Sequence, residues 1–492
     1  SRTYVYTSKG CRLLKDINLG DSVLSRAGWE TVTKVYNNGV RRVWRLVTDR
    51  GSILEGTGKH RVRVLLDGKL GWKELKHLTS DDYVVGAFDY LGSHGTLLDL
   101  PDLIIPQYVK HTEHPLKRNQ VDLRFSVKCN TELAYLLGTW DGGGIIRAHD
   151  LFWQGHLKEK IAGEQNLRRW FQGIAGPRAL GVPQVILSAP REYVVAYLQG
   201  LFDAGGWVSN KGQVGIRLNE NSDEFLRQVQ ELLTGLGVDS RISKSTVKVV
   251  GKSCIHVILQ VISRKSKQRF ASQIGFTETH EQKKLLKFID QPKQKIKDGQ
   301  KYPVGQTFLS LYAKCHPPKS PMTKFSRSFY NAPSKARKTG LVFRTDVETL
   351  LEYAAQVQVE GPEVDFLKHI LTLHVMQVKS VINTGIDEPV MDLEVTGDHE
   401  YLTGPVFSHN SGDIVTATWV DDDLRSANRV QFQCLKSRDQ KPFERFESRV
   451  EWPCRRLLTC LDGSMTPTPM GQRSGVGTPP PDAIEDAARV LD

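Results

Sequence analysis

Short runs of apolar and β-branched residues, separated by glycines, fill residues 3–85 of the chain. Each run has the length of a strand and ends at a glycine or a polar turn, a pattern typical of antiparallel β structure. The strand signals fall at residues 22–24, 30–36, 42–48 and 60–65. A turn is expected at residues 37–39, Asn-Asn-Gly. Strand signals return from about Val375 and end at Phe407, so β structure is predicted at residues 3–85 and again at residues 375–407.

The period of the apolar positions changes from about Asn130. Two stretches repeat apolar residues at three- and four-residue steps, which predicts two helices. Their apolar positions are Leu133, Leu136, Leu137 and Trp140 in the first, and Val194, Tyr197, Leu198 and Leu201 in the second. Strand signals then alternate with helical ones, the strands at 208–218, 240–250 and 256–262 and the helices at 222–236 and 266–274. This order predicts an α+β domain inserted into a β domain.

Two further segments differ from both patterns. Residues 291–338 are rich in Lys, Pro and Ser, which favours a linker or a DNA-contacting extension over core. Beyond Ser411 the composition changes again, and the Thr- and Pro-rich residues 466–481 are of low complexity. We expect this tail to be disordered and to belong to a different protein.

Composition limits the class of protein. A chain of 492 residues is too long for one core and is expected to form roughly two to four domains. With 39% hydrophobic and 25% charged residues, it has the composition of a globular protein. There is no apolar run long enough to cross a bilayer, and residues 1–5 lack the layout of a signal peptide. These features predict an intracellular protein, cytoplasmic or nuclear, with no membrane partner.

Charge and cysteines narrow the choice of partners. The seven cysteines form no CxxC pair, so the sequence indicates neither a disulfide framework nor a metal site. The net charge of +12 and the pI of about 9.2 suggest a polyanionic partner such as DNA or RNA. A solvated basic surface without a ligand would have the same composition, so charge alone does not decide between them.

The tripeptide His409-Asn410-Ser411 carries the chemistry of peptide-bond cleavage without water. An Asn side-chain amide can attack its own backbone carbonyl, close a succinimide ring and cut the chain after itself. An adjacent His can polarise that carbonyl and donate protons, and a following Ser hydroxyl can first accept an acyl group. Because the sequence His-Asn-Ser often occurs by chance, the residues around it decide whether it is functional.

Those surroundings resemble inteins of the Hint (Hedgehog/intein) family. The similar blocks are residues 14–23 (LKDINLGDSV), the TxxH motif of residues 57–60, residues 72–75 and 82–84, and, downstream, residues 381–382, 390–395, His399, Tyr401 and 407–410. The resemblance implies that Thr57 and His60 polarise and protonate the upstream scissile amide. It implies that Asp392 and His399 assist the acyl shift and Asn cyclisation, and that the partners in cis are the exteins of a host protein. No cofactor is implied for splicing.

The start of the chain departs from the family pattern. In the family the first residue is usually Cys, sometimes Ser or Ala, and a Thr follows about five residues later. Here that Thr is Thr3, which suggests that the chain begins some three residues inside the intein. Ser1 is therefore a weak candidate for the upstream nucleophile. Full splicing needs such a nucleophile, whereas cleavage after Asn410 does not.

Residues 133–144 and 197–206 resemble the two helices of LAGLIDADG (DOD-type) homing endonucleases, which bind double-stranded DNA at a homing site. In that family the acid before the final Gly binds Mg²⁺, and here those positions are Gly143 and Gly205. Asp141 and Asp203 hold the preceding acid position, which in the family usually caps or packs. A shift of two residues turns a helical side chain by about 200°, so these acids are poor replacements. We therefore predict that the nuclease is inactive, and Mg²⁺ would be its cofactor only if it were active.

The expected fold is an all-β Hint splicing domain interrupted by an α+β LAGLIDADG endonuclease domain, with a partly disordered C-terminal tail. The predicted boundaries are 1–100 and 375–410 for the halves of the Hint domain, 101–290 for the endonuclease domain, 291–374 for a basic linker or extension, and 411–492 for a C-extein segment of the host. Two alternatives stay open: a catalytically inert DNA-binding remnant, and an active Mg²⁺-dependent site-specific homing endonuclease.

Overall fold

The computed structural model describes residues 3–66, 68–93, 95–110, 118–125, 128–144, 164–176, 181–249, 252–277, 279–290, 300–317, 327–397, 399–409, 414–437, 446–451 and 456–458. The chain divides into two compact units, Ser1–His409 and Asn410–Asp492. Ser1, Asn410 and Ser411 and the low-complexity tail lie outside the described residues, so the predictions made for them are not addressed by the fold.

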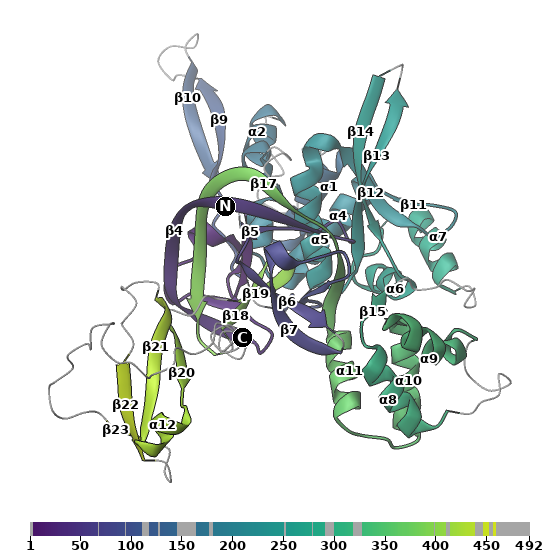
Figure 1. Ribbon diagram of the computed structural model, residues 1–492. Helices are drawn as coiled ribbons and strands as arrows, with labels where there is room; N and C mark the ends of the chain where they lie inside the picture. Colours follow the sequence, from purple (N-terminus) through teal and green to yellow (C-terminus); the bar gives the residue numbers. More distant parts are fainter. Residues whose placement is uncertain are drawn as a thin grey trace. The chain divides into compact units, whose positions relative to one another are not determined.

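The two ends of the first unit form one antiparallel sheet of eleven strands, the splicing sheet (Figure 1). Its strands are β1 (Tyr4–Thr7), β2 (Gly10–Leu13), β3 (Ser22–Leu24), β4 (Trp29–Thr48), β5 (Ile53–Thr57), β6 (Arg61–Leu66), β7 (Lys69–Glu74), β8 (Tyr83–Ala87), β17 (Leu373–Val395), β18 (Glu400–Thr403) and β19 (Val406–His409). Strand β17 pairs first with β8 and then with β4. Segments nearly the whole unit apart in sequence therefore share one sheet.

The turn expected at residues 37–39 is not a turn. Strand β4 runs without a break from Trp29 to Thr48, beside β17 for most of its length (Figure 1). Pro389 pairs with Val40 and Met391 pairs with Asn37, so two residues of β4 oppose one residue of β17. Gly39, with φ of 69°, supplies the backbone conformation that such a bulge needs. The polar Asn-Asn-Gly sequence marks a bulge because a long partner strand continues past it.

Residues 131–290 contain the predicted pair of helices, α1 (Thr131–Gly142) and α4 (Arg191–Gly205). A four-stranded antiparallel sheet follows, in the order β11 (Gly206–Val208), β12 (Val214–Asn219), β14 (Lys252–Val261), β13 (Ser240–Val249). The other elements between residues 103 and 290 are β9 (Leu103–Lys110), β10 (Arg118–Phe125), α2 (Glu164–Ala175), α3 (Gln184–Leu187), α5 (Asp223–Gly235), α6 (Arg264–Gln273) and α7 (Thr279–Asp290). The α+β pattern expected after the second helix is confirmed.

The prediction of a linker for residues 291–374 is wrong for the described part of that range. Strands β15 (Lys301–Tyr302) and β16 (Val342–Phe343) pair, and four helices accompany them: α8 (Gly305–Cys315), α9 (Arg327–Thr339), α10 (Arg344–Gln356) and α11 (Pro362–Thr372). Phe308, Phe329, Leu350 and Leu367 are fully buried among these helices. The composition did not reveal these helices, in which lysines such as Lys314, Lys335 and Lys338 are exposed while the apolar residues enter the core.

The second unit contains an antiparallel sheet in the order β20 (Ile414–Trp419), β21 (Arg429–Ser437), β22 (Phe446–Glu451), β23 (Arg456–Leu458). A short helix, α12 (Asp422–Ser426), connects the first two strands and is capped by the side chain of Asp421. Across both units, none of the helices in the described ranges combines the length and apolar character required to cross a membrane.

Candidate functional site

Thr57 and His60 lie in the turn between β5 and β6, where the His60 amide donates a hydrogen bond of 3.0 Å to the Thr57 carbonyl. Strand β6 then pairs with β19 through Val62 and Ser408. The register places the TxxH turn against the last strand before the predicted downstream junction. Two motifs separated by about 350 residues are thus brought together by one strand pair.

A chain of polar side chains connects His60 to this last strand. The His60 Nε2 atom lies 2.8 Å from the Ser408 hydroxyl, which in turn hydrogen bonds to the hydroxyl of Thr403 on β18. Ser408 is fully buried, and Thr403 is nearly so. Because buried polar groups require partners, this chain fixes the orientation of the imidazole ring.

Burial lowers the pKa of His60 below its usual 6.5, and the nearby Asp392 carboxylate partly opposes the shift. A neutral imidazole at pH 7 is the form that can accept and return a proton. Asp392, on β17, is itself buried and accepts hydrogen bonds of 3.0 Å from the Tyr401 hydroxyl and 2.9 Å from the Leu393 amide. The carboxylate is therefore held in place near the imidazole.

The lowered pKa of His60 makes a prediction about stability. Unfolded chains bind a proton at His60 near pH 6.5, whereas the folded chain resists that proton, so stability should fall as pH drops below 6.5. We expect urea unfolding at pH 7.5 and 5.5 to show a smaller loss of unfolding free energy for His60→Gln than for the unaltered chain. Equal losses of unfolding free energy in the two proteins would contradict a lowered pKa of His60.

A small cavity of about 40 Å³ joins the TxxH turn to the first strand. Its lining includes Thr3, Thr57, His60, Tyr401 and Thr403. The chain before β1 and the TxxH turn therefore meet at one place, as a role for Thr57 and His60 at the upstream amide requires.

His409, the last residue of β19, packs against the indole of Trp72 in a T-shaped arrangement with ring centroids 4.7 Å apart. The Arg63 guanidinium lies 3.7 Å from the centroid of that indole and donates to the fully buried Glu400 carboxylate at 2.7 Å. Arg26 lies 2.9 Å from the same carboxylate. This arrangement supports the His409 ring from one side.

Sequence reasoning missed Ser408, Glu400 and Arg63 as members of the site. One signal for Glu400 was present, since an acidic residue beside the apolar Tyr401 and Leu402 in a predicted strand is unusual. His399 lies directly before β18 in a left-handed conformation with φ of 55°. It is not among the described residues that line the cavity around His60.

The two glycine-containing helices make reciprocal contacts. The Tyr135 hydroxyl on α1 donates to Asp203 on α4 at 2.9 Å, and the Tyr197 hydroxyl on α4 donates to Asp141 on α1 at 2.7 Å. Asp141 is almost fully buried. Each acid thus accepts a hydrogen bond from the facing helix.

The glycines of these helices allow the backbones to touch. A β-carbon at Gly138 would lie 1.9 Å from the Tyr197 carbonyl oxygen, and one at Gly200 would lie 2.0 Å from the Tyr135 carbonyl oxygen. Gly143 ends α1 with φ of 94°, and a β-carbon at Gly205 would lie 2.6 Å from the Gly142 carbonyl oxygen. Within the described residues, no group of three His, Cys, Asp or Glu side chains is arranged to hold a metal ion.

Known proteins are similar to parts of this chain. Residues 192–275 match the family model of the LAGLIDADG-like domain. A glutamine–fructose-6-phosphate aminotransferase from Methanocaldococcus jannaschii is 27% identical over 46% of this chain and 19% of its own length. A DNA polymerase from Thermococcus litoralis is 33% identical over 25% of this chain and 7% of its own length. The replicative DNA helicase DnaB from a Synechocystis species is 21% identical over 77% of this chain and 44% of its own length.

Each of these relatives is matched over less than half of its own length. Among solved structures, the gp41-1 intein is similar over 26% of this chain and 84% of its own, with 17% identity and a TM-score of 0.15. The blocks around the TxxH turn and the last strand, with the match of residues 192–275 to the LAGLIDADG-like domain, support an intein that carries a LAGLIDADG-type homing endonuclease domain.

Proposed function

We propose that this chain cuts its own backbone after Asn410 and that its endonuclease domain no longer cuts DNA. The observation that carries the first part is the placement of His409, which β19 and the Trp72–Arg63–Glu400 arrangement hold beside the His60–Ser408 hydrogen bond. In the sequence, Asn410 follows directly.

In the proposed step, the side-chain amide nitrogen of Asn410 attacks the carbonyl carbon of the same residue. A carbon–nitrogen bond forms, which closes an aminosuccinimide, and the peptide bond to Ser411 breaks. The proton lost by the attacking nitrogen balances the one gained by the leaving amine of Ser411. His409 polarises the carbonyl and transfers the proton.

At the upstream junction, Thr57 and His60 polarise the scissile amide and protonate its nitrogen, and a side-chain nucleophile attacks its carbonyl. Ser1 or a residue that precedes it supplies that nucleophile. Ser411 then accepts the acyl group, and Asp392 and His399 assist the acyl shift. The cavity shared by Thr3, Thr57 and His60 supports this assignment.

For the endonuclease domain we propose DNA binding without strand cleavage. The positions that would need a metal-binding acid are Gly143 and Gly205, and glycine offers no side-chain oxygen to Mg²⁺. Asp141 and Asp203 accept hydrogen bonds from Tyr197 and Tyr135, which supports a packing role for both acids. The partners are thus double-stranded DNA and, in cis, the exteins of a host protein, with residues 411–492 as the downstream segment.

The function is tested by identifying the fragments that form when the purified chain is incubated at neutral pH. We expect mass spectrometry to find one fragment that begins at Ser411 and a second that ends in an aminosuccinimide at position 410. Cleavage at other bonds only, or a chain that stays intact with its native flanking residues, would contradict the proposal. Plasmid DNA with Mg²⁺ in the same mixture should remain unnicked.

A further inference from the structure

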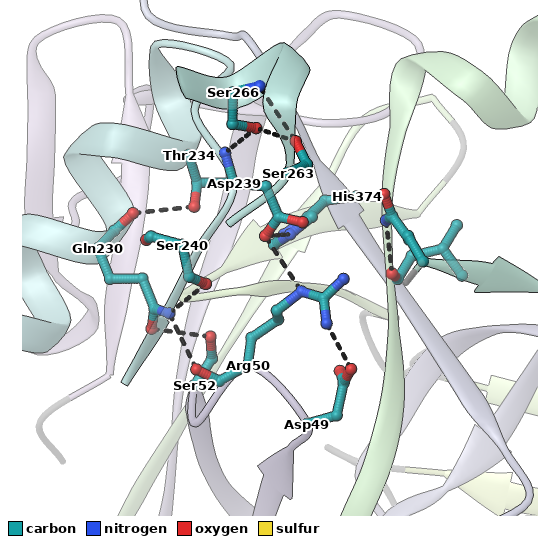
Figure 2. Close-up of polar contacts among 12 residues, drawn as sticks. Asp49, Arg50, Ser52, Gln230, Thr234, Asp239, Ser240, Ser263, Ser266 and His374 are labelled. Carbon is teal, nitrogen blue, oxygen red and sulfur yellow. Dashed lines mark hydrogen bonds and ion pairs between the residues drawn. The ribbon is translucent and has the colours of Figure 1, made fainter. Parts of the chain in front are cut away.

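A buried ion network connects the endonuclease domain to the splicing sheet (Figure 2). Asp239, between α5 and β13, accepts a hydrogen bond of 3.1 Å from Nε of Arg50, in the turn between β4 and β5. The same Asp239 oxygen lies 3.3 Å from Nε2 of His374, at the start of β17. All three side chains are at least 94% buried. Asp49 pairs with Arg50 from the other side at 2.5 Å.

A glutamine on α5 holds the same turn through two hydrogen bonds and bonds to β13 through a third (Figure 2). The Gln230 amide nitrogen donates to the carbonyls of Arg50 and Ser240, both at 3.0 Å, and its oxygen accepts from the Ser52 hydroxyl at 3.0 Å. The Ile242 amide donates to the Arg50 carbonyl at 2.9 Å. The turn of the splicing sheet is thus enclosed by the endonuclease domain.

A second glutamine of α5 reaches the first strand. The Gln228 amide nitrogen donates to the Tyr4 hydroxyl at 2.6 Å, and its oxygen accepts from the Val182 amide at 2.6 Å. Tyr4 adjoins Thr3, which lines the cavity beside Thr57. Gln228 is almost fully buried, so this contact is formed inside the molecule.

The segments held in this way are those that carry the candidate splicing groups. The turn at Arg50 leads into β5, which ends at Thr57, and His374 is the second residue of the strand that bears Asp392. Burial raises the pKa of Asp239, but the Arg50 guanidinium and the His374 imidazole outweigh this effect and lower that pKa to about 2, so the carboxylate is charged at neutral pH. A buried charge that loses its partner is strongly unfavourable, which makes this connection sensitive to single substitutions.

We propose that the endonuclease domain has a second function that needs neither DNA nor metal: it is a cis-acting scaffold for the splicing sheet, with Asp239 as its main positioning residue. The domain fixes the β4–β5 turn and the start of β17, and thereby the distance between Thr57 and Asp392. This function gives a reason for an intein to keep an endonuclease domain whose metal-binding acids are absent. The proposal is tested by hydrogen–deuterium exchange and by the rate of release after Asn410, and only the second of these rests on the proposed function.

The test compares Asp239→Asn with Asp290→Asn, a matched substitution at an exposed acid of the same domain. Hydrogen–deuterium exchange is measured for peptides that cover residues 45–57 and 373–381, and the release of the segment that begins at Ser411 is timed. For Asp239→Asn we expect exchange in both peptides to rise by ~10-fold or more, and release to slow by ~10-fold. The amides of α1 and α4 should stay protected in both variants.

Unchanged exchange in both peptides of a folded Asp239→Asn protein would overturn the scaffold function. If the unaltered chain releases nothing, the proposed cleavage fails, but the exchange comparison still decides the scaffold. If Asp239→Asn does not fold, Ser52→Ala provides the milder test, because it removes one donor to Gln230 and no charge. Higher exchange in residues 45–57 of that variant would support the scaffold, and unchanged exchange would contradict it.

Discussion

Replacing Asn410 with alanine is expected to lower the release of the segment that begins at Ser411 by at least roughly 10³-fold. Alanine has no side-chain nitrogen that could attack the carbonyl, so the only remaining route is ordinary hydrolysis. The measurement is a time course on a denaturing gel, with the fragment ends identified by mass spectrometry. Asn221→Ala, at an exposed asparagine of the same chain, serves as the control and should release the segment at the unaltered rate.

A Ser411→Ala variant separates two explanations of release. If Asn410 cyclises directly, this variant keeps cutting, because the serine hydroxyl takes no part in ring closure. If release requires an acyl group on Ser411 first, the variant stops as completely as Asn410→Ala. Release that persists in Asn410→Ala would rule out cyclisation whatever the result at Ser411.

The local elements of the fold were largely predictable because their signals are local. The apolar repeats that contain Leu133 and Leu198 gave the two helices correctly, and the strand signal at residues 240–250 corresponds to β13. Such periods depend on which face of an element is buried, and residues three or four apart report this directly. The same reasoning failed at Gly39, where pairing with a distant strand, β17, makes the strand continue through a bulge.

The candidate site was predictable only in part, since its contacts cross the whole first unit. The TxxH motif identified Thr57 and His60, but nothing near them in sequence points to Ser408, which lies 2.8 Å from the His60 ring. Glu400 was equally hard to predict, because its partners Arg26 and Arg63 come from the other end of the first unit. Pairing of this kind depends on the strand register, which a single sequence does not specify.

The residue type at position 205 of the endonuclease motif is restricted by the atoms packed against it. A β-carbon at Gly205 would lie 2.6 Å from the Gly142 carbonyl oxygen and 3.2 Å from a methyl group of Ile216. An acid at this position would therefore require the end of α1 to move. A glycine at position 205 and the close approach of the two helix ends are therefore linked.

Replacing Gly200 with alanine is expected to lower the free energy of unfolding of the first unit by at least about 3 kcal/mol. The added methyl group would lie 2.0 Å from the Tyr135 carbonyl oxygen, a backbone atom that cannot rotate away. The hydrogen bonds from Tyr135 to Asp203 and from Tyr197 to Asp141 resist separation of the helices. Urea unfolding followed by circular dichroism measures the change.

The control is Gly173→Ala in α2, since a β-carbon there would meet nothing within 4 Å. Because alanine favours a helix over glycine, this variant should be as stable as the unaltered chain or more stable by ~0.5–1 kcal/mol. Opposite signs for the same chemical change would show that backbone contact, and not helix propensity, explains the glycine on α4. If the two variants behave alike, the helices are not packed through Gly200. The scaffold proposed for the splicing sheet would then lack its rigid centre, because α5 and its two glutamines are positioned by the core that these helices form.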